Sequence, residues 1–99
     1  MDHTITAATV DELTVAYTED GIETVKQIDK VILTKGAWST IIFRQQDWDR
    51  RKEVYGPDKY SIRRYQKRNG EYKLRSKFVI SSKDQATQLI EVLNKWMVK

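Results

Sequence analysis

The chain alternates between short β-rich runs and polar breaks, and a helical spacing appears only near its end. Four runs, 29–34, 38–48, 59–68 and 71–80, combine β-branched and aromatic residues and are bounded by turn signals, as expected for strands. Between 23 and 33 the apolar residues also recur every three positions, so the pattern there is ambiguous between a helix and a strand. We interpret this part of the chain as a strand.

Turn signals separate these runs. Asn69-Gly70 is the strongest of them, because both residues tolerate the positive φ that a two-residue type I′ hairpin turn needs. The runs on either side of it are therefore the two arms of a hairpin. The polar stretch 49–58, DRRKEVYGPD, contains a Gly-Pro breaker and predicts an exposed, mobile loop.

The last element is predicted to be a helix. Ser81 or Ser82 can cap its first turn, and Asp84 or Gln85 can complete a capping box. One apolar stripe then follows at three-to-four-residue spacing, formed by Ala86, Leu89, Ile90, Leu93 and Trp96 or Met97. A stripe of this length needs a covering surface, either the sheet or the same helix of a second copy.

These elements predict an α+β fold over residues 29–99, with a curved four-stranded antiparallel sheet followed by one C-terminal helix. Residues 1–28 are predicted to be an N-terminal extension, either partly disordered or holding an extra strand, because they show only a short apolar alternation at Leu13, Val15 and Tyr17. The helical stripe exceeds what so small a sheet can cover. We therefore expect a homodimer that forms through the C-terminal helix.

The net charge of +4 is unevenly distributed along the chain. Residues 1–43 hold three Lys/Arg and seven Asp/Glu, residues 44–77 hold twelve and five, and residues 78–99 hold three and two. The middle part therefore carries the positive surplus. Such a surplus is typical of a face that binds a polyanion, although a solvated sheet surface can also carry it.

The composition argues against several kinds of chemistry. The chain has no cysteine and a single histidine, His3, so it offers no Ser/His, Cys/His or multi-histidine site. No apolar run approaches the roughly 20 residues that span a bilayer, and no signal-peptide pattern opens the sequence. We expect a cytoplasmic protein, nucleoid-associated if bacterial, that is not an enzyme and needs no cofactor. Asp47, Asp49 and Asp58 are only weak evidence for metal-dependent phosphate chemistry.

The Asn-Gly turn predicts which hairpin side chains share a face. The numbers of facing residues then sum to 139, which places Arg64 opposite Arg75. One face holds the cations Arg64, Lys73, Arg75 and Lys77. Because directly opposed like charges cost stability, an anionic partner explains them better than surface filling. The other face, around Tyr65 and Leu74, is expected to meet the helix.

Aromatic residues accompany these cations. Cations that neutralise phosphates, combined with ring faces that stack on bases, are typical of proteins that bind single-stranded nucleic acid. Several of the rings must also fill the core of so small a domain. The rings in question are Trp38, Phe43, Trp48, Tyr60 and Tyr65.

The order of the elements resembles that of the C-terminal domain of the transcriptional coactivator positive cofactor four, a family that binds single-stranded DNA. The stretches YSIRRYQKRNGEYKLRSKFVISSKDQATQLIEVL and TKGAWSTIIFR carry this resemblance, which covers about 29–98. Whirly and Pur-repeat proteins are related in design and also bind single strands. The resemblance implies that the third strand carries Tyr60, Ile62, Arg63 and Tyr65. It places Lys73 and Lys77 on the fourth strand, and Val79 to Ser82 at the junction with the helix.

The resemblance implies a homodimer whose helices pack across a two-fold axis, while its sheets present basic, aromatic grooves to single-stranded DNA or melted duplex. The sequence departs from the family at two places. Gln66 stands where the family has a Trp, and the loop 49–58 is longer than the family's connection.

The residues and the resemblance together predict a single-stranded DNA- or RNA-binding protein with a role like that of a transcriptional coactivator or regulator. Its expected partners are single-stranded nucleic acid and the transcription machinery. The alternative is an interaction module that docks its basic face on an acidic protein, which would need cations but no rings. The predicted contacts are Arg44, Arg64, Lys73, Arg75 and Lys77 for phosphates, and Trp48, Tyr60 and Tyr65 for stacking.

Overall fold

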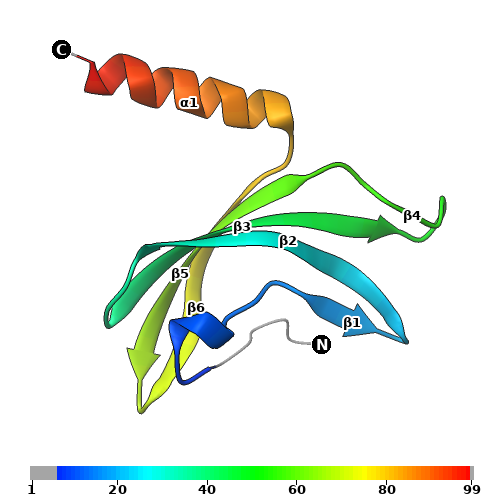
Figure 1. Ribbon diagram of the computed structural model, residues 1–99, viewed down its shortest axis with the longest axis horizontal. Coiled ribbons are helices and arrows are strands. Elements are labelled where there is room, and N and C mark those ends of the chain that lie inside the picture. Colours follow the sequence, from blue (N-terminus) through cyan, green and yellow to red (C-terminus); the bar gives the residue numbers. More distant parts are fainter. Residues whose placement is uncertain (1–6, 99) are drawn as a thin grey trace.

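The computed structural model describes residues 7–98 and has an α+β fold (Figure 1). His3 and the rest of residues 1–6 lie outside this part. A curled antiparallel sheet has the strand order β1-β2-β3-β5-β6, with β4 paired to β3. The elements are the 3-10 helix η1 Val10–Glu12, β1 Tyr17–Glu19, β2 Ile22–Thr34, β3 Trp38–Asp49, β4 Val54–Tyr55, β5 Lys59–Arg68, β6 Glu71–Ile80 and α1 Lys83–Met97.

The four predicted strands are present, but the predicted count of four is too low. β2 begins at Ile22, so the helical interpretation of 23–33 is wrong. The predicted loop 49–58 contains β4, which pairs with the end of β3 through Trp48 and Tyr55. β1 adds a further strand beside β2. Within the described residues no helix is long and apolar enough to cross a membrane.

Residues 7–16, here called the N-terminal segment, pack on one face of the sheet and form half of the hydrophobic core. Val10, Leu13 and Val15 are buried from this side. They meet a patch of the sheet that consists of Ile41, Phe43, Tyr65 and Tyr72. This part of the predicted extension therefore belongs to the same folded unit as the sheet.

Lys30 on β2 holds the N-terminal segment by its backbone. Its Nζ donates hydrogen bonds to the carbonyls of Val10, Asp11 and Leu13 at 2.6, 3.1 and 2.7 Å. Burial lowers the pKa of Lys30, and the nearby Asp11 carboxylate opposes this effect. A further backbone hydrogen bond from Tyr72 to the Ala7 carbonyl, at 2.7 Å, ties the start of the segment to β6. The segment is thus fixed at its start and through its middle.

The hairpin of β5 and β6 follows the prediction near its turn and departs from it beyond. Asn69 and Gly70 both have positive φ, 53° and 78°, which confirms the type I′ turn. The predicted pairs hold as far as Tyr65 opposite Leu74. There the register shifts by one residue, because a β-bulge leaves Arg75 unpaired on β6.

The bulge overturns the predicted basic face. Beyond it Arg64 lies opposite Ser76, and Lys77 lies opposite Arg63. Since side chains alternate between faces along a strand, the extra residue moves Lys77 to the face opposite that of Arg64. The predicted placement of Lys77 beside Arg64 and Lys73 is therefore wrong, and Arg64 and Arg75 are not directly opposed.

Replacing Gly70 by valine should lower the free energy of unfolding by at least about 1 kcal/mol, because a β-branched residue is strained at positive φ. No heavy atom lies within 4 Å of a Cβ built at Gly70, so crowding would not contribute. Thermal unfolding measures the loss. Gly70→Asn is the matched control, since Asn tolerates this conformation and should cost less. An equal melting temperature for Gly70→Val and the wild type would contradict this account.

The predicted helix is α1, and its first turn is capped as expected. The Ser82 hydroxyl accepts a hydrogen bond from the Gln85 backbone at 3.1 Å, and the Gln85 side chain accepts one from the Ser81 backbone at 2.9 Å. The helix stands away from the curled sheet (Figure 1). None of its residues is buried. The apolar stripe is therefore largely uncovered within one chain.

Candidate nucleic-acid interface

The sheet presents two different faces. The segment face carries the N-terminal segment and the buried patch around Phe43 and Tyr65. The helix face lies toward α1, where Ile42, Ile62 and Phe78 line an apolar groove beneath the helix. The prediction that the hairpin face around Tyr65 and Leu74 meets the helix is wrong, because the N-terminal segment covers that face instead.

Three of the predicted cations gather on the helix face near the hairpin turn. Cross-strand pairing places Trp38, Gln66 and Lys73 in one row, and Thr40, Arg64 and Ser76 in the next. The bulged Arg75 donates a hydrogen bond from its Nε to Gln66 Oε1 at 3.0 Å. Three strands thus form one surface, here called the hairpin patch, which consists of Trp38, Arg64, Gln66, Lys73 and Arg75.

Trp38 supplies an aromatic ring within the hairpin patch. It is 44 % exposed, and the Arg64 guanidinium lies 4.7 Å from its ring centroid. This is a cation-π contact, which holds the guanidinium beside the ring. Trp38 was among the rings noted in the sequence but was not among the predicted contacts. Only the register of β3 against β5 places Trp38 directly beside Gln66. Gln66 is the position at which the family that the sequence resembles has a Trp.

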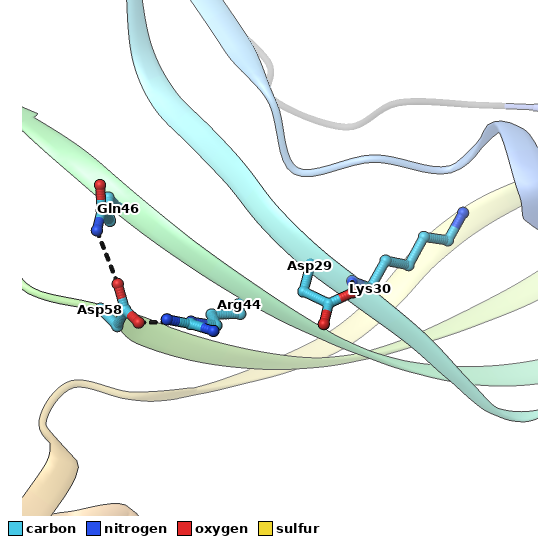
Figure 2. Close-up of polar contacts among 5 residues, drawn as sticks. All are labelled: Asp29, Lys30, Arg44, Gln46 and Asp58. Atoms are coloured by element: carbon cyan, nitrogen blue, oxygen red, sulfur yellow. Dashed lines mark hydrogen bonds and ion pairs between the residues drawn. The ribbon is translucent and has the colours of Figure 1, made fainter.

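Arg44 is engaged at a different place on the helix face. Figure 2 shows its guanidinium directed at Asp58, with which it forms an ion pair, while Gln46 donates a hydrogen bond to the other Asp58 oxygen at 2.8 Å. The bond from Gln46, followed by that from Arg44, lowers the pKa of Asp58. The bond to Asp58 raises the pKa of Arg44. The carboxylate takes up the Nε of Arg44 and balances its charge, which weakens the attraction of this guanidinium for a phosphate.

Two of the predicted stacking rings lie apart from the hairpin patch. Trp48 makes an edge-to-face contact with Tyr55, with ring centroids 5.0 Å apart. Ten residues of β3 separate it from Trp38, which corresponds to about 33 Å along the strand. Tyr60 lies in the apolar groove beneath α1. Neither ring shares a surface with Arg64, Lys73 and Arg75.

The third predicted stacking ring is part of the core. Tyr65 is only 1 % exposed, so its assignment to base stacking is wrong. Burial raises the pKa of its phenol, and the neighbouring Arg63 guanidinium opposes this effect. The reason lies in the N-terminal segment, whose apolar residues cover the ring. Nothing local to β5 indicates that cover.

A second cationic surface lies on the segment face and was missed by the sequence analysis. It is a cleft of about 390 Å³ between the end of the N-terminal segment and β6. Its polar lining includes Lys59, Ser61 and Arg63, at alternate positions of β5. That alternation could have grouped them, but only the observed bulge adds Lys77. We call this surface the cationic cleft.

The acidic residues considered for metal chemistry do not form a cluster of the kind that binds a metal. Among the described residues, no group of three or more His, Cys, Asp or Glu side chains could hold a metal ion. Asp47 accepts a hydrogen bond from Lys59, Asp58 pairs with Arg44, and Asp49 caps the turn before β4 by accepting from the backbone of Arg51.

Comparison with known proteins assigns no family. No family model matches the sequence, no curated protein is significantly similar to it, and no solved structure is a significant match. The resemblance to the positive cofactor four family therefore stays a prediction from the sequence.

Proposed function

We propose that the protein binds single-stranded nucleic acid, DNA or RNA, at the hairpin patch and does so without catalysis. The row of Trp38, Gln66 and Lys73 is the observation that carries this proposal. An exposed ring for a base lies there beside side chains that can contact phosphates. The cations Lys73, Arg64 and Arg75 would neutralise the backbone, and Trp38 would stack on a base.

The ring also separates this function from the alternative of an acidic protein partner, which would need cations but no ring. A further explanation is purely protective: β6 is an edge strand of the sheet, and exposed lysines on such a strand prevent edge-to-edge association. That explanation accounts for Lys73 but not for an exposed Trp38 on the neighbouring part of the sheet. A role in transcription and a cytoplasmic location, which the resemblance and the sequence suggest, are part of the proposal.

We also propose that two copies associate through α1 and the apolar groove. The groove is lined mainly by apolar side chains of β5, β6 and α1, including Ile62, Phe78, Leu89 and Leu93. The radius of gyration is 15.1 Å, whereas a compact domain of this length has about 12.6 Å. The accessible area is 7179 Å², whereas a compact monomer of this mass exposes about 5,900 Å². The excess exceeds the roughly 800 Å² that each partner contributes to a standard interface.

Salt dependence tests the nucleic-acid proposal. If Arg64, Lys73 and Arg75 each contact one phosphate, the logarithm of the affinity for a single strand should fall with log salt at a slope of about −2. Replacing Lys73 and Arg75 together by glutamine should flatten the slope by about 1.4. Trp38→Ala should weaken binding by roughly 1 to 3 kcal/mol and leave the slope unchanged, because stacking releases no counterions. Fluorescence anisotropy at several salt concentrations measures both quantities.

The matched control replaces Arg51 and Lys52 by glutamine. Both are exposed in the turn before β4, at the opposite end of β3 from Trp38, so the same loss of charge there should leave the slope nearly unchanged. Equal affinity for duplex and single strands, or a wild-type slope in the Lys73/Arg75 variant, would reject the proposal. Binding of an acidic peptide in place of oligonucleotides would favour the docking alternative.

A further inference from the structure

The cationic cleft combines two kinds of polar group that the hairpin patch does not. One end holds the carboxylate of Asp47 beside Lys59, and the other holds Arg63 and Lys77 facing each other across β5 and β6. The first end is an ion pair without net charge, which favours neutral hydrogen-bonding groups, whereas the second end carries two positive charges, which favour an anion. The cleft therefore fits a ligand with hydrogen-bond donors at one end and an anion at the other.

The Asp47 end has the donor and acceptor pattern that complements guanine. Asp47 Oδ1 accepts from Gln45 Nε2 at 3.0 Å, and Oδ2 accepts from Lys59 Nζ at 2.9 Å. Each carboxylate oxygen can accept a second bond, so both remain open to a ligand. Guanine presents two adjacent N–H donors to such a carboxylate, and next to them an O6 acceptor that the Lys59 ammonium can reach. Adenine, cytosine and uracil each place an acceptor beside their donor.

The opposite end of the cleft has the groups that bind phosphate. Arg63 and Lys77 form a cross-strand pair on the segment face. The Nε of Arg63 is buried and has no hydrogen-bond acceptor among the described residues. Because this Nε is out of reach of solvent, a phosphate would contact the terminal N–H groups of the Arg63 guanidinium and the Lys77 ammonium, with charge-assisted bonds.

The spacing of the two ends sets the size of the ligand. The register places Lys77 two strands from Asp47 and several residues further along the sheet. The backbones there are roughly 20 Å apart if the curl of the sheet is ignored, and the long Lys and Arg side chains shorten that gap. A single monophosphate is too short for this span. A guanine followed by at least one further phosphate, as in a triphosphate or a short single strand, is long enough.

We propose that the cationic cleft binds a guanine nucleotide, with Asp47 and Lys59 reading the base and Arg63 and Lys77 holding a phosphate. This second site lies on the face opposite the hairpin patch and does not depend on the function proposed there. The two possible sources of this ligand share one chemistry, a guanine nucleotide that is followed by at least one further phosphate. The source is either a free nucleoside triphosphate or a guanine within a single strand.

Calorimetric titration of the full chain with GTP, and with the 5′-phosphorylated dinucleotide pGpT, tests the site. Each should bind about fivefold or more tightly than ATP or pApT, because a bidentate contact to a base edge distinguishes bases by at least about that factor. Asp47→Asn should abolish the preference for guanine, while Asp84→Asn on α1 should retain it. Lys77→Gln should weaken guanine and adenine ligands alike. Circular dichroism and the melting temperature establish that each variant is folded.

The remaining outcomes separate the two sources and the two sites. Tighter binding of GTP than of pGpT identifies the free nucleotide, and the reverse identifies the single strand. The Lys73/Arg75 double variant should bind guanine ligands as the wild type does, so a loss of function at the hairpin patch leaves this site measurable. Equal affinities for guanine and adenine ligands, no binding at millimolar concentrations, or a guanine preference that survives in Asp47→Asn would overturn the proposal.

Discussion

Replacing Leu93 by glutamate should convert the protein from a dimer into a monomer. Leu93 is 51 % exposed and lines the apolar groove together with Ile90 of the same helix and Phe78 of β6. If a second copy covers this groove, the variant would bury a carboxylate among apolar side chains, which is strongly unfavourable. Light scattering at tens of micromolar should give twice the 11.7 kDa of the chain for the wild type, and the single-chain mass for the variant.

The sheet should survive this substitution, because α1 contributes no buried residue to the fold of one chain. Strand content by circular dichroism checks that point. Lys95→Glu is the matched control, since position 95 lies on the side of the helix opposite the apolar stripe and should leave the dimer intact. A wild-type mass equal to that of one chain would reject the proposed association. So would a Leu93→Glu variant that keeps the dimer mass.

Local signals predicted the elements whose shape depends on neighbouring residues. Asn69-Gly70 predicted the hairpin turn because positive φ is a property of those two positions alone. A cap at Ser81 or Ser82 was predicted for the same reason, and in the structure Ser82 forms it with Gln85, three residues away. Both features need no information from the rest of the chain.

Features that depend on distant residues were not predicted. The bulge at Arg75 leaves the local alternation of polar and apolar residues almost unchanged, and only pairing with β5 reveals it. The short alternation around Leu13 carried no sign that it covers Phe43 and Tyr65, far along the chain. Both errors changed the candidate site. The bulge moved Lys77 to the segment face, and the covering segment removed Tyr65 from the surface.

The site was predicted as one surface but is divided by the geometry of the sheet. A strand of ten or more residues carries its ends about 30 Å or more apart, so residues on one strand need not share a site. Trp48 and Trp38 lie near opposite ends of β3 for this reason. Arg44 lies between them and forms an ion pair with Asp58. Only Arg64, Lys73 and Arg75 of the eight predicted contacts meet in one patch.

Truncating Leu13 to alanine should lower the free energy of unfolding by about 2 to 5 kcal/mol, the range for a fully buried leucine. Leu13 is 1 % exposed and packs with Val10 and Val15 against the sheet. Its carbonyl also accepts a hydrogen bond from Lys30 at 2.7 Å, so the backbone cannot easily move to fill the cavity. Urea unfolding at a fixed protein concentration measures the loss, since dimer formation would make stability depend on concentration.

Leu33→Ala provides the comparison, because it removes the same atoms from a side chain that is 54 % exposed. Its effect should be no more than about 0.5 kcal/mol, as for most surface positions. A large difference between the two variants means that the N-terminal segment is part of the cooperative core, and that removing it would expose Phe43 and Tyr65. Equal, small effects would mean that the segment lies on the sheet without stabilising it, in which case Tyr65 would become accessible to a base after all.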